Sequence, residues 1–247
     1  MYCEGRDSME AGKQVKSKQR VADHGEVFTA EREVKAMCDL VKQETERIDS
    51  RFLEPACGDG NFLAEILRRK LAVVKKKYSK SAADYAQNAI LAASSIYGVD
   101  ILQDNVEACR ERLFAIWDKE YQAVCKKETS EDVRKAAQFI LRRNILCGNA
   151  LSLKTVDEYG HDLDTPIIFS EWTFVTGALI NRRDFRLDVL LLENPDKENY
   201  AMQMSLFADE PTGMDNWTTD PVTQQRLPKP LRVFPPTDYR RIWEYGA

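Results

Sequence analysis

The run Glu54-Pro55-Ala56-Cys57-Gly58-Asp59-Gly60-Asn61 constrains the fold of this chain more than any other segment. Arg51-Phe52-Leu53-Glu54 is interpreted as a short buried strand that ends at Pro55, and the run precedes residues 62–67, whose apolar side chains recur at helical spacing. Two glycines two positions apart allow a tight turn in which the backbone comes close to a ligand at the start of a helix. The sequence therefore predicts a strand, a glycine loop and a helix in that order.

Further strands and helices are expected to alternate along the chain. A helix follows Thr29, whose hydroxyl is expected to cap it, and residues 68–94 are predicted to form one or two helices. Helices are also expected at 104–121 and from Ser130, and strands at 95–100, 145–147, 166–169 and 187–192. This alternation predicts an α/β fold with a doubly wound, mostly parallel sheet.

Composition divides the chain into a domain with two tails. Residues 1–24 are polar and are predicted to form a mobile tail, residues 25–195 the folded domain, and residues 196–247 an irregular tail that docks on a partner or packs on the domain. The formal net charge is -4, so any DNA contact must be local or shared with another chain.

Neither a membrane segment nor a metal site is expected. Apolar runs are too short to span a bilayer, the six cysteines form no Cys-x-x-Cys pair, and the two histidines lack metal-ligand spacing. The cysteines are therefore interpreted as reduced thiols, and a cytoplasmic location is expected.

Polar residues stand where three predicted strands end. Glu54 ends the first, Asp100 the second, and Asn149 follows the third. Taken singly, each has a plainer explanation, because Asp is a frequent helix cap, Asn a frequent turn residue, and a lone Gly-x-Gly more often a tight turn than a cofactor loop. Their order along successive strands favours a site for a nucleotide-type cofactor, with Glu54 accepting from an ammonium and Asp100 from ribose hydroxyls.

The run from Glu54 to Leu63 resembles motif I of the N6-adenine DNA methyltransferases of restriction-modification systems. The segment 24–29 is similar to motif X of the class in which motif X comes first, 97–101 to motif II, and 148–151 to motif III. The resemblance spans about residues 24 to 151. It implies a Rossmann-like methyltransferase fold, S-adenosylmethionine as cofactor, and adenine in DNA as the methyl acceptor.

The resemblance also implies roles for individual residues. Phe28 and Thr29 are expected to close over the methionine end of the cofactor, while Ile101 lies on the adenine ring and Asn149 pairs with the adenine edge. The complete expected cofactor set is Phe28, Thr29, Glu54, Pro55, Ala56, Gly58, Gly60, Asn61, Asp100, Ile101, Asn149 and Ala150.

The sequence departs from the family at two points. Glu54 and Asp100 are further apart than usual, which implies a helical insertion between the first two strands. The catalytic motif, Asn-Pro-Pro-Tyr or a close variant, has only Asn194-Pro195 as a counterpart, followed by Asp196-Lys197 in place of Pro and an aromatic ring. We interpret Asn194 and Pro195 as the end of a strand in preference to a working motif, so no catalytic residue is intact.

These departures favour a split enzyme, in which this chain supplies the cofactor site and a partner supplies the catalytic motif and target recognition, so that DNA is bound through the complex. A methyltransferase-like regulatory protein without catalysis is the alternative, and a complete methyltransferase for a small molecule or RNA is a third reading.

Two weaker patterns remain. The basic runs 68–70 and 75–77 are interpreted as a solvated helix face in preference to a phosphate site. Gln203 to Phe207 resembles the peptide that binds the bacterial sliding clamp, but five residues are a short match. These residues and the apolar anchors in 228–236 are expected either to dock on a partner or to pack on the chain's own domain.

Overall fold

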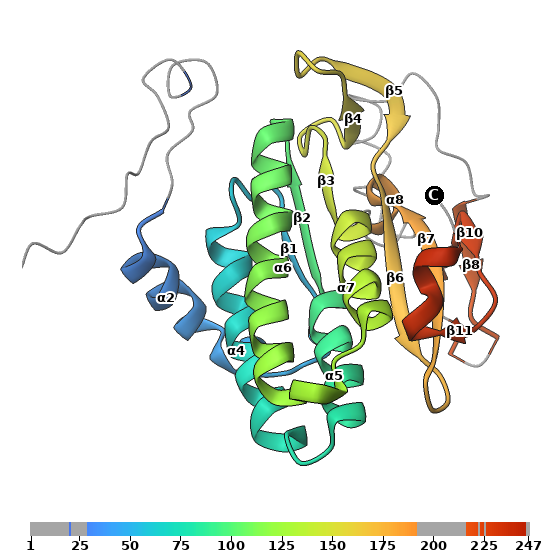
Figure 1. Ribbon diagram of the computed structural model, residues 1–247. Helices are drawn as coiled ribbons and strands as arrows, with labels where there is room; N and C mark the ends of the chain where they lie inside the picture. The colour runs from blue at the N-terminus through green and yellow to red at the C-terminus, as the bar shows by residue number, and fades with distance from the viewer. Residues whose placement is uncertain (1–19, 21–28, 192–215, 222, 225, 246–247) are drawn as a thin grey trace, which may run out of the picture.

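The computed structural model describes residues 20, 29–191, 216–221, 223, 224 and 226–245 (Figure 1). The first half of the chain alternates helices and strands, in the order α2 (Glu31–Leu40), α3 (Lys42–Thr45), β1 (Phe52–Glu54), α4 (Asn61–Tyr78), α5 (Ala82–Ser94), β2 (Ile96–Asp100), α6 (Gln103–Cys125), α7 (Glu131–Asn144) and β3 (Ile145–Cys147). Two helices lie between β1 and β2: α4 is the helix predicted after the glycine loop, and α5 is the additional helix that the long spacing implied.

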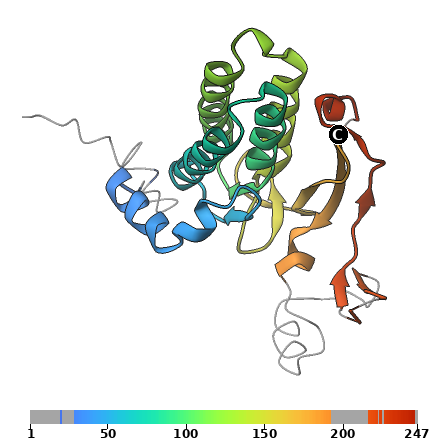
Figure 2. The same cartoon turned by 90° about the horizontal axis from the view of Figure 1, so that it is seen from below.

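Strands β1, β2 and β3 form a parallel sheet in that order, with Phe52 opposite Ile96 and Gly98 opposite Ile145. Helices α4, α5, α6 and α7 all lie on one side of this sheet (Figure 2). The main apolar core lies among these helices and the sheet, with Trp117 and Tyr85 fully enclosed. The α/β class and a parallel sheet are confirmed, whereas in the described part no long helix covers the second face of this sheet, as a doubly wound arrangement would require.

The second half of the chain is mainly antiparallel. It contains β4 (Lys154–Val156), β5 (Asp162–Pro166), β6 (Ile168–Phe174), β7 (Leu179–Arg186), α8 (Leu187–Leu191), β8 (Trp217–Thr219), β9 (Arg226–Pro228), β10 (Arg232–Val233), β11 (Thr237–Asp238) and the 3-10 helix η3 (Tyr239–Glu244). Strands β6, β10 and β11 all pair antiparallel with β7, and β4–β5 and β8–β9 form separate antiparallel pairs. A mostly parallel sheet was therefore the wrong expectation for these strands.

The predicted strand at 187–192 is also wrong, because residues 187–191 form the helix α8. Arg186, the last residue of β7, pairs with Asp188 in the first turn of α8 at 2.5 Å, and Leu187 and Val189 are buried. A short apolar run suits a buried strand or a buried helix equally, so periodicity alone does not separate them. Asn194 and Pro195 lie outside the described residues, but they do not follow a strand formed by this run.

Both ends of the domain differ from expectation. The hydroxyl of Thr29 does not cap α2, which begins after Ala30 without a side-chain cap. The C-terminal tail is not irregular throughout, because β10 and β11 extend the β7 sheet. Phe234 packs on the Arg182 guanidinium, 4.2 Å from ring centroid to Cζ, whereas Val233 stays 65% exposed. The segment 228–236 thus packs on the chain's own domain in part, through Phe234. Gln203 to Phe207 lie outside the described residues.

A few buried polar contacts join the two halves. The Asn144 amide donates to the carbonyls of Ser94 and Ile96 and accepts from the Trp172 indole at 2.9 Å. The Tyr97 hydroxyl on β2 donates to the Ser170 carbonyl on β6 at 3.0 Å. Because buried polar groups are costly to leave unpaired, these bonds hold β6 against the parallel sheet.

Lys70 corrects the interpretation of the basic runs. It is fully buried on α4, and its ammonium donates to the carbonyls of Arg47, Ile48 and Ser50 at 2.8, 3.1 and 2.6 Å. Lys75, Lys76 and Lys77 are exposed, as expected for a solvated face. Lys70 therefore fixes the segment that leads into β1.

Among the residues that the structure describes, no helix combines the length and apolar character required to cross a lipid bilayer.

Candidate functional site

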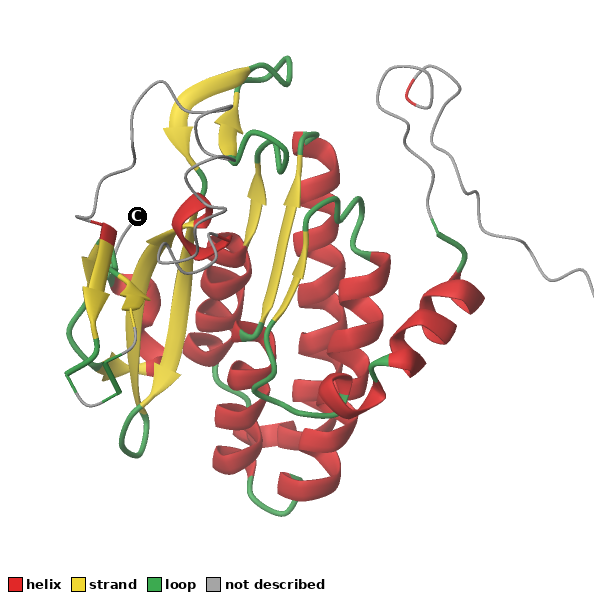
Figure 3. Cartoon of the chain, turned by 180° about the vertical axis from the view of Figure 1, so that it is seen from behind, coloured by secondary structure: helices red, strands yellow, loops and turns green. Residues whose placement is uncertain are grey.

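The three parallel strands point to one edge of the sheet, as their arrowheads show in Figure 3. Glu54, Asp100 and Cys147 are the last residues of β1, β2 and β3. In open parallel sheets, ligands bind at this carboxyl edge, where loops and helix N-termini converge. The structure thus brings Glu54, Asp100 and the glycine loop to one edge, as predicted.

At two positions of the glycine loop, the backbone adopts a conformation that only glycine tolerates well. Gly58 has φ 52° and Gly60 has φ 86°, both in the left-handed region. The Cys57 amide donates to the Val99 carbonyl at 2.9 Å, and the Gly60 amide donates to the Cys57 carbonyl at 2.8 Å. The loop is therefore tied to β2 before it turns into α4.

Gly60 serves packing more than ligand approach. A Cβ atom at this position would lie 2.6 Å from the Sγ atom of Cys109 on α6, which is closer than van der Waals contact allows. The sequence predicted that a ligand lies against this position, but the neighbour is the helix α6. The glycine is needed because α4 starts directly against α6.

Asp100 is the centre of the hydrogen-bond network at this edge. One carboxylate oxygen accepts from the Gly58 amide at 2.9 Å, and the other accepts from the Leu102 amide at 2.9 Å and the Asn105 side chain at 3.1 Å. A carboxylate has about four lone-pair sites, so one remains on the oxygen that faces Gly58. A ligand diol with two hydroxyls would therefore replace the Gly58 contact or share that oxygen.

Glu54, like Asp100, has no cationic partner among the described residues, and it accepts fewer hydrogen bonds than Asp100 does. Its half-buried carboxylate accepts a backbone hydrogen bond from Ala56, and burial raises the pKa of Glu54 above the ordinary glutamate value. A carboxylate withdrawn from water without a counter-charge is a fitting acceptor for a ligand ammonium.

The polar side chain that follows the third strand is less available to a ligand than the sequence suggested. The Asn149 amide donates to Asp162 at 2.9 Å and accepts from the Leu151 backbone at 2.9 Å, so both its ends already have partners in a turn. Ala150 packs against the apolar cluster around Val99 and Ile167. Pairing of Asn149 with an adenine edge would require these contacts to break.

The hairpin of β4 and β5 was not foreseen from the sequence. Its turn brings Gly160 next to Ile101, with 3.6 Å between the Ile101 Cγ1 atom and a Cβ built at Gly160. Ile101 is half-buried beside this turn. The Asp-Glu-Tyr-Gly-His stretch at 157–161 is a recognisable turn signal, but nothing in it indicates which strand end it reaches.

Arg112 on α6 is a site residue that sequence reasoning missed. Its guanidinium donates to the Asn61 side chain at 2.7 Å and pairs with Asp59 at 3.2 Å. Asn61 in turn donates to the Thr29 carbonyl at 3.5 Å. Arg112 thus connects α6, the glycine loop and the start of the described N-terminal segment, a long-range contact that no local pattern announces.

The remaining predicted site residues divide into two groups. Pro55 and Ala56 are exposed. Phe28, Asn194 and Pro195 lie outside the described residues. The described part contains no group of three or more His, Cys, Asp or Glu side chains arranged to hold a metal ion.

In comparisons with protein-family models, curated proteins and solved structures, the chain has no match.

Proposed function

We propose that this chain is the S-adenosylmethionine-binding subunit of a DNA adenine-N6 methyltransferase of a restriction-modification system, with a Rossmann-like methyltransferase core. A partner polypeptide supplies the Asn-Pro-Pro-aromatic motif and target recognition. The observation that carries the proposal is the pair of acids, Glu54 and Asp100, at the ends of adjacent parallel strands with the Gly58 loop bonded between them.

The residues present fit the two polar ends of the cofactor to different degrees. Glu54 suits the ammonium because its carboxylate is half-buried and has no cationic partner among the described residues. Asp100 suits the ribose hydroxyls with one free lone-pair site and a second that the Gly58 amide would release. The bound cofactor supplies the methyl group, and this chain's own residues bind and orient it.

Purified alone, the chain is expected to transfer no methyl group to DNA. Asp196 and Lys197 directly follow Asn194-Pro195 where the motif has Pro and an aromatic residue, so an extruded adenine would have no ring at that position to stack on. Incorporation of labelled methyl groups into DNA, followed by detection of N6-methyladenine, measures this directly. Co-expression with a polypeptide that carries an Asn-Pro-Pro-aromatic motif is expected to restore transfer.

Robust N6-adenine methylation by the chain alone would contradict the split reading. Cofactor binding without methylation in any complex would instead favour the regulatory alternative, in which a methyltransferase-like protein holds the cofactor and does not use it.

Replacing Arg112 by glutamine is expected to weaken cofactor binding about 5- to 30-fold, which corresponds to about 1–2 kcal/mol. The variant loses the charge-assisted bond to Asn61 and the ion pair with Asp59, so the glycine loop is held less firmly. Calorimetry measures the affinity. The matched control is Lys119→Gln, an exposed cation on the same helix. Equal affinities for both variants would show that Arg112 does not position the loop.

A further inference from the structure

Strand β1 has an open edge in the described chain, where it pairs only with β2. The Phe52 amide donates to the Ser95 carbonyl at 2.9 Å, so the backbone groups of Phe52 face β2. Backbone groups alternate along a parallel strand, and the N–H and C=O of Leu53 therefore face the open side. Such an edge is a template on which another strand can pair.

Apolar cavities flank this open edge on both sides of the sheet. The cavity on the helix side has a volume of about 210 Å³ and is lined by Met37 of α2, by Val41 between α2 and α3, and by Phe62 and Ile66 of α4. Met37 and Val41 are 52% and 47% exposed. Large side chains left open to water at an unpaired edge indicate a surface that another chain covers.

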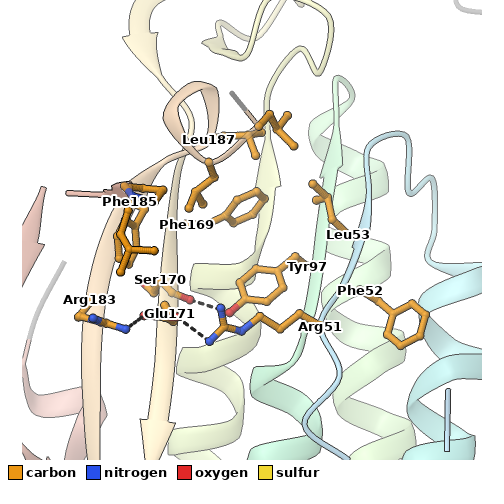
Figure 4. A pocket seen from close by; sticks show the side chains of 14 residues that line it. Arg51, Phe52, Leu53, Tyr97, Phe169, Ser170, Glu171, Arg183, Phe185 and Leu187 are labelled. Carbon is orange, nitrogen blue, oxygen red and sulfur yellow. Dashed lines mark hydrogen bonds and ion pairs between the residues drawn. The ribbon is translucent and has the colours of Figure 1, made fainter. Parts of the chain in front are cut away.

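The cavity on the opposite face is larger, with a volume of about 460 Å³ (Figure 4). It is lined by apolar side chains from β2, β6, β7 and α8, among them Tyr97, Phe169, Phe185 and Leu190. Both cavities share Phe52 and Leu53. They therefore lie on the two sides of the same strand.

A strand fits the open edge of β1 and its two cavities better than a helix does. A strand placed beside β1 sends alternate side chains to the two faces of the sheet, and here both faces offer apolar cavities. Parallel strands buried on both faces are nearly continuous apolar runs. A helix would fill one of the cavities and leave the Leu53 backbone groups unpaired.

Charge at the start of β1 adds a further requirement. Glu171 on β6 pairs with both Arg51, at 2.6 Å, and Arg183. Arg51 and Arg183 are 56% and 44% exposed, and two cations on one carboxylate leave a net positive charge at this end of the strand. An acidic residue at the start of a parallel partner strand would meet that charge.

We propose that the open edge of β1 binds a parallel strand of the second polypeptide, a run of about five apolar residues preceded by an acid. This inference rests on the proposed split methyltransferase. Parallel pairing places the end of the partner strand beside Glu54, at the carboxyl edge where the cofactor site lies. The catalytic motif that follows the partner's strand would then face the cofactor.

Two substitutions at Leu53 separate strand pairing from side-chain packing. Leu53→Ala shortens the side chain and keeps the N–H group, whereas Leu53→Pro also removes the N–H group. Proline is tolerated on an edge strand when its N–H side faces outward, so the chain's own pairing with β2 is retained. The probe is a separately expressed polypeptide that carries an apolar run followed by an Asn-Pro-Pro-aromatic motif. Leu53→Pro is expected to weaken its binding at least about tenfold more than Leu53→Ala does.

Hydrogen exchange on the unmodified chain provides the second readout, which does not depend on whether Leu53→Pro folds. Addition of the partner is expected to slow exchange of the Leu53 amide at least about tenfold. A complex that forms with the Leu53 amide unprotected would overturn the strand proposal and leave the split enzyme standing.

The other outcomes are also decisive. If the Asn-Pro-Pro-aromatic polypeptide does not bind, both the strand proposal and the split enzyme fail, and calorimetry with the cofactor shows separately whether the cofactor site stands. If sedimentation shows that this chain alone forms a dimer that Leu53→Pro dissociates, the occupant of the edge is a second copy and the proposal is overturned.

Discussion

Replacing Glu54 by glutamine is expected to weaken S-adenosylmethionine binding about 10- to 150-fold while raising the thermal stability of the ligand-free chain. The loss of affinity follows from removing a charge-assisted hydrogen bond to the cofactor ammonium, worth about 1.5–3 kcal/mol. The gain in stability follows from the raised pKa of Glu54, which burial causes. Calorimetry and thermal unfolding on the same samples measure the two effects.

The sign of the stability effect depends on which state holds the proton more tightly. A raised pKa means that the folded chain binds the Glu54 proton better than the unfolded chain does. The ionised carboxylate therefore lowers the free energy of unfolding once the pH rises above the pKa of an ordinary glutamate. This destabilisation is complete when the pH is above the pKa of Glu54 in the folded chain. The neutral amide of glutamine removes this destabilisation at pH 7.

Glu33→Gln is the matched control, because Glu33 is an exposed glutamate on α2. It is expected to change neither affinity nor stability appreciably. Unchanged cofactor affinity in Glu54→Gln would show that this carboxylate does not contact the ammonium, even if its effect on stability is as expected.

Replacing Lys70 by methionine is expected to lower the free energy of unfolding by about 2–4 kcal/mol, because three backbone carbonyls would lose their donor. Methionine has a similar length and recovers part of the loss through apolar packing. The matched control is Lys76→Met, an exposed lysine on the same helix, which is expected to change stability by less than about 0.5 kcal/mol. Urea unfolding monitored by circular dichroism measures both variants.

The Lys70 variant also has an expected pH signature. Burial lowers the pKa of Lys70 to about 7. Between that value and the ordinary lysine pKa near 10.5, the unfolded chain binds the proton, whereas Lys70 in the folded chain is a neutral amine that donates to two of the three carbonyls. Stability from this group therefore rises with pH, because the folded chain no longer buries a charge. The stability difference between wild type and Lys70→Met is therefore expected to widen from pH 7 to pH 10. A difference that is absent at every pH would mean that Lys70 does not anchor β1.

The strand ends of the first half of the chain could be predicted because their signals are local. A glycine loop, an acid after each of two apolar runs and helical periodicity between them indicated β1, β2 and β3 in the correct order. The longer separation of Glu54 and Asp100 also indicated the extra helix correctly. The loop, the acids and the periodicity each lie within a few neighbouring residues, and the separation of the two acids is counted directly along the chain.

Contacts between distant residues could not be predicted in the same way. Lys70 belongs to a basic run typical of a solvated face, yet three carbonyls that precede it by about 20 residues hold it in the core. Nothing in the sequence distinguishes Arg112 from the other cations, and only the fold places it beside Asn61. The strands of the second half were wrongly predicted for a related reason. Whether an apolar run forms a parallel or an antiparallel strand depends on the strand with which it pairs, as β6 does with β7.

Isothermal titration calorimetry of S-adenosylmethionine with the purified full-length chain decides whether this chain holds the cofactor. We expect saturable binding at one site per chain, competition by S-adenosylhomocysteine, and a loss of affinity of about 1–3 kcal/mol in Asp100→Ala. Absence of binding to the folded chain, both alone and in complex with the Asn-Pro-Pro-aromatic polypeptide, would contradict the proposed cofactor site.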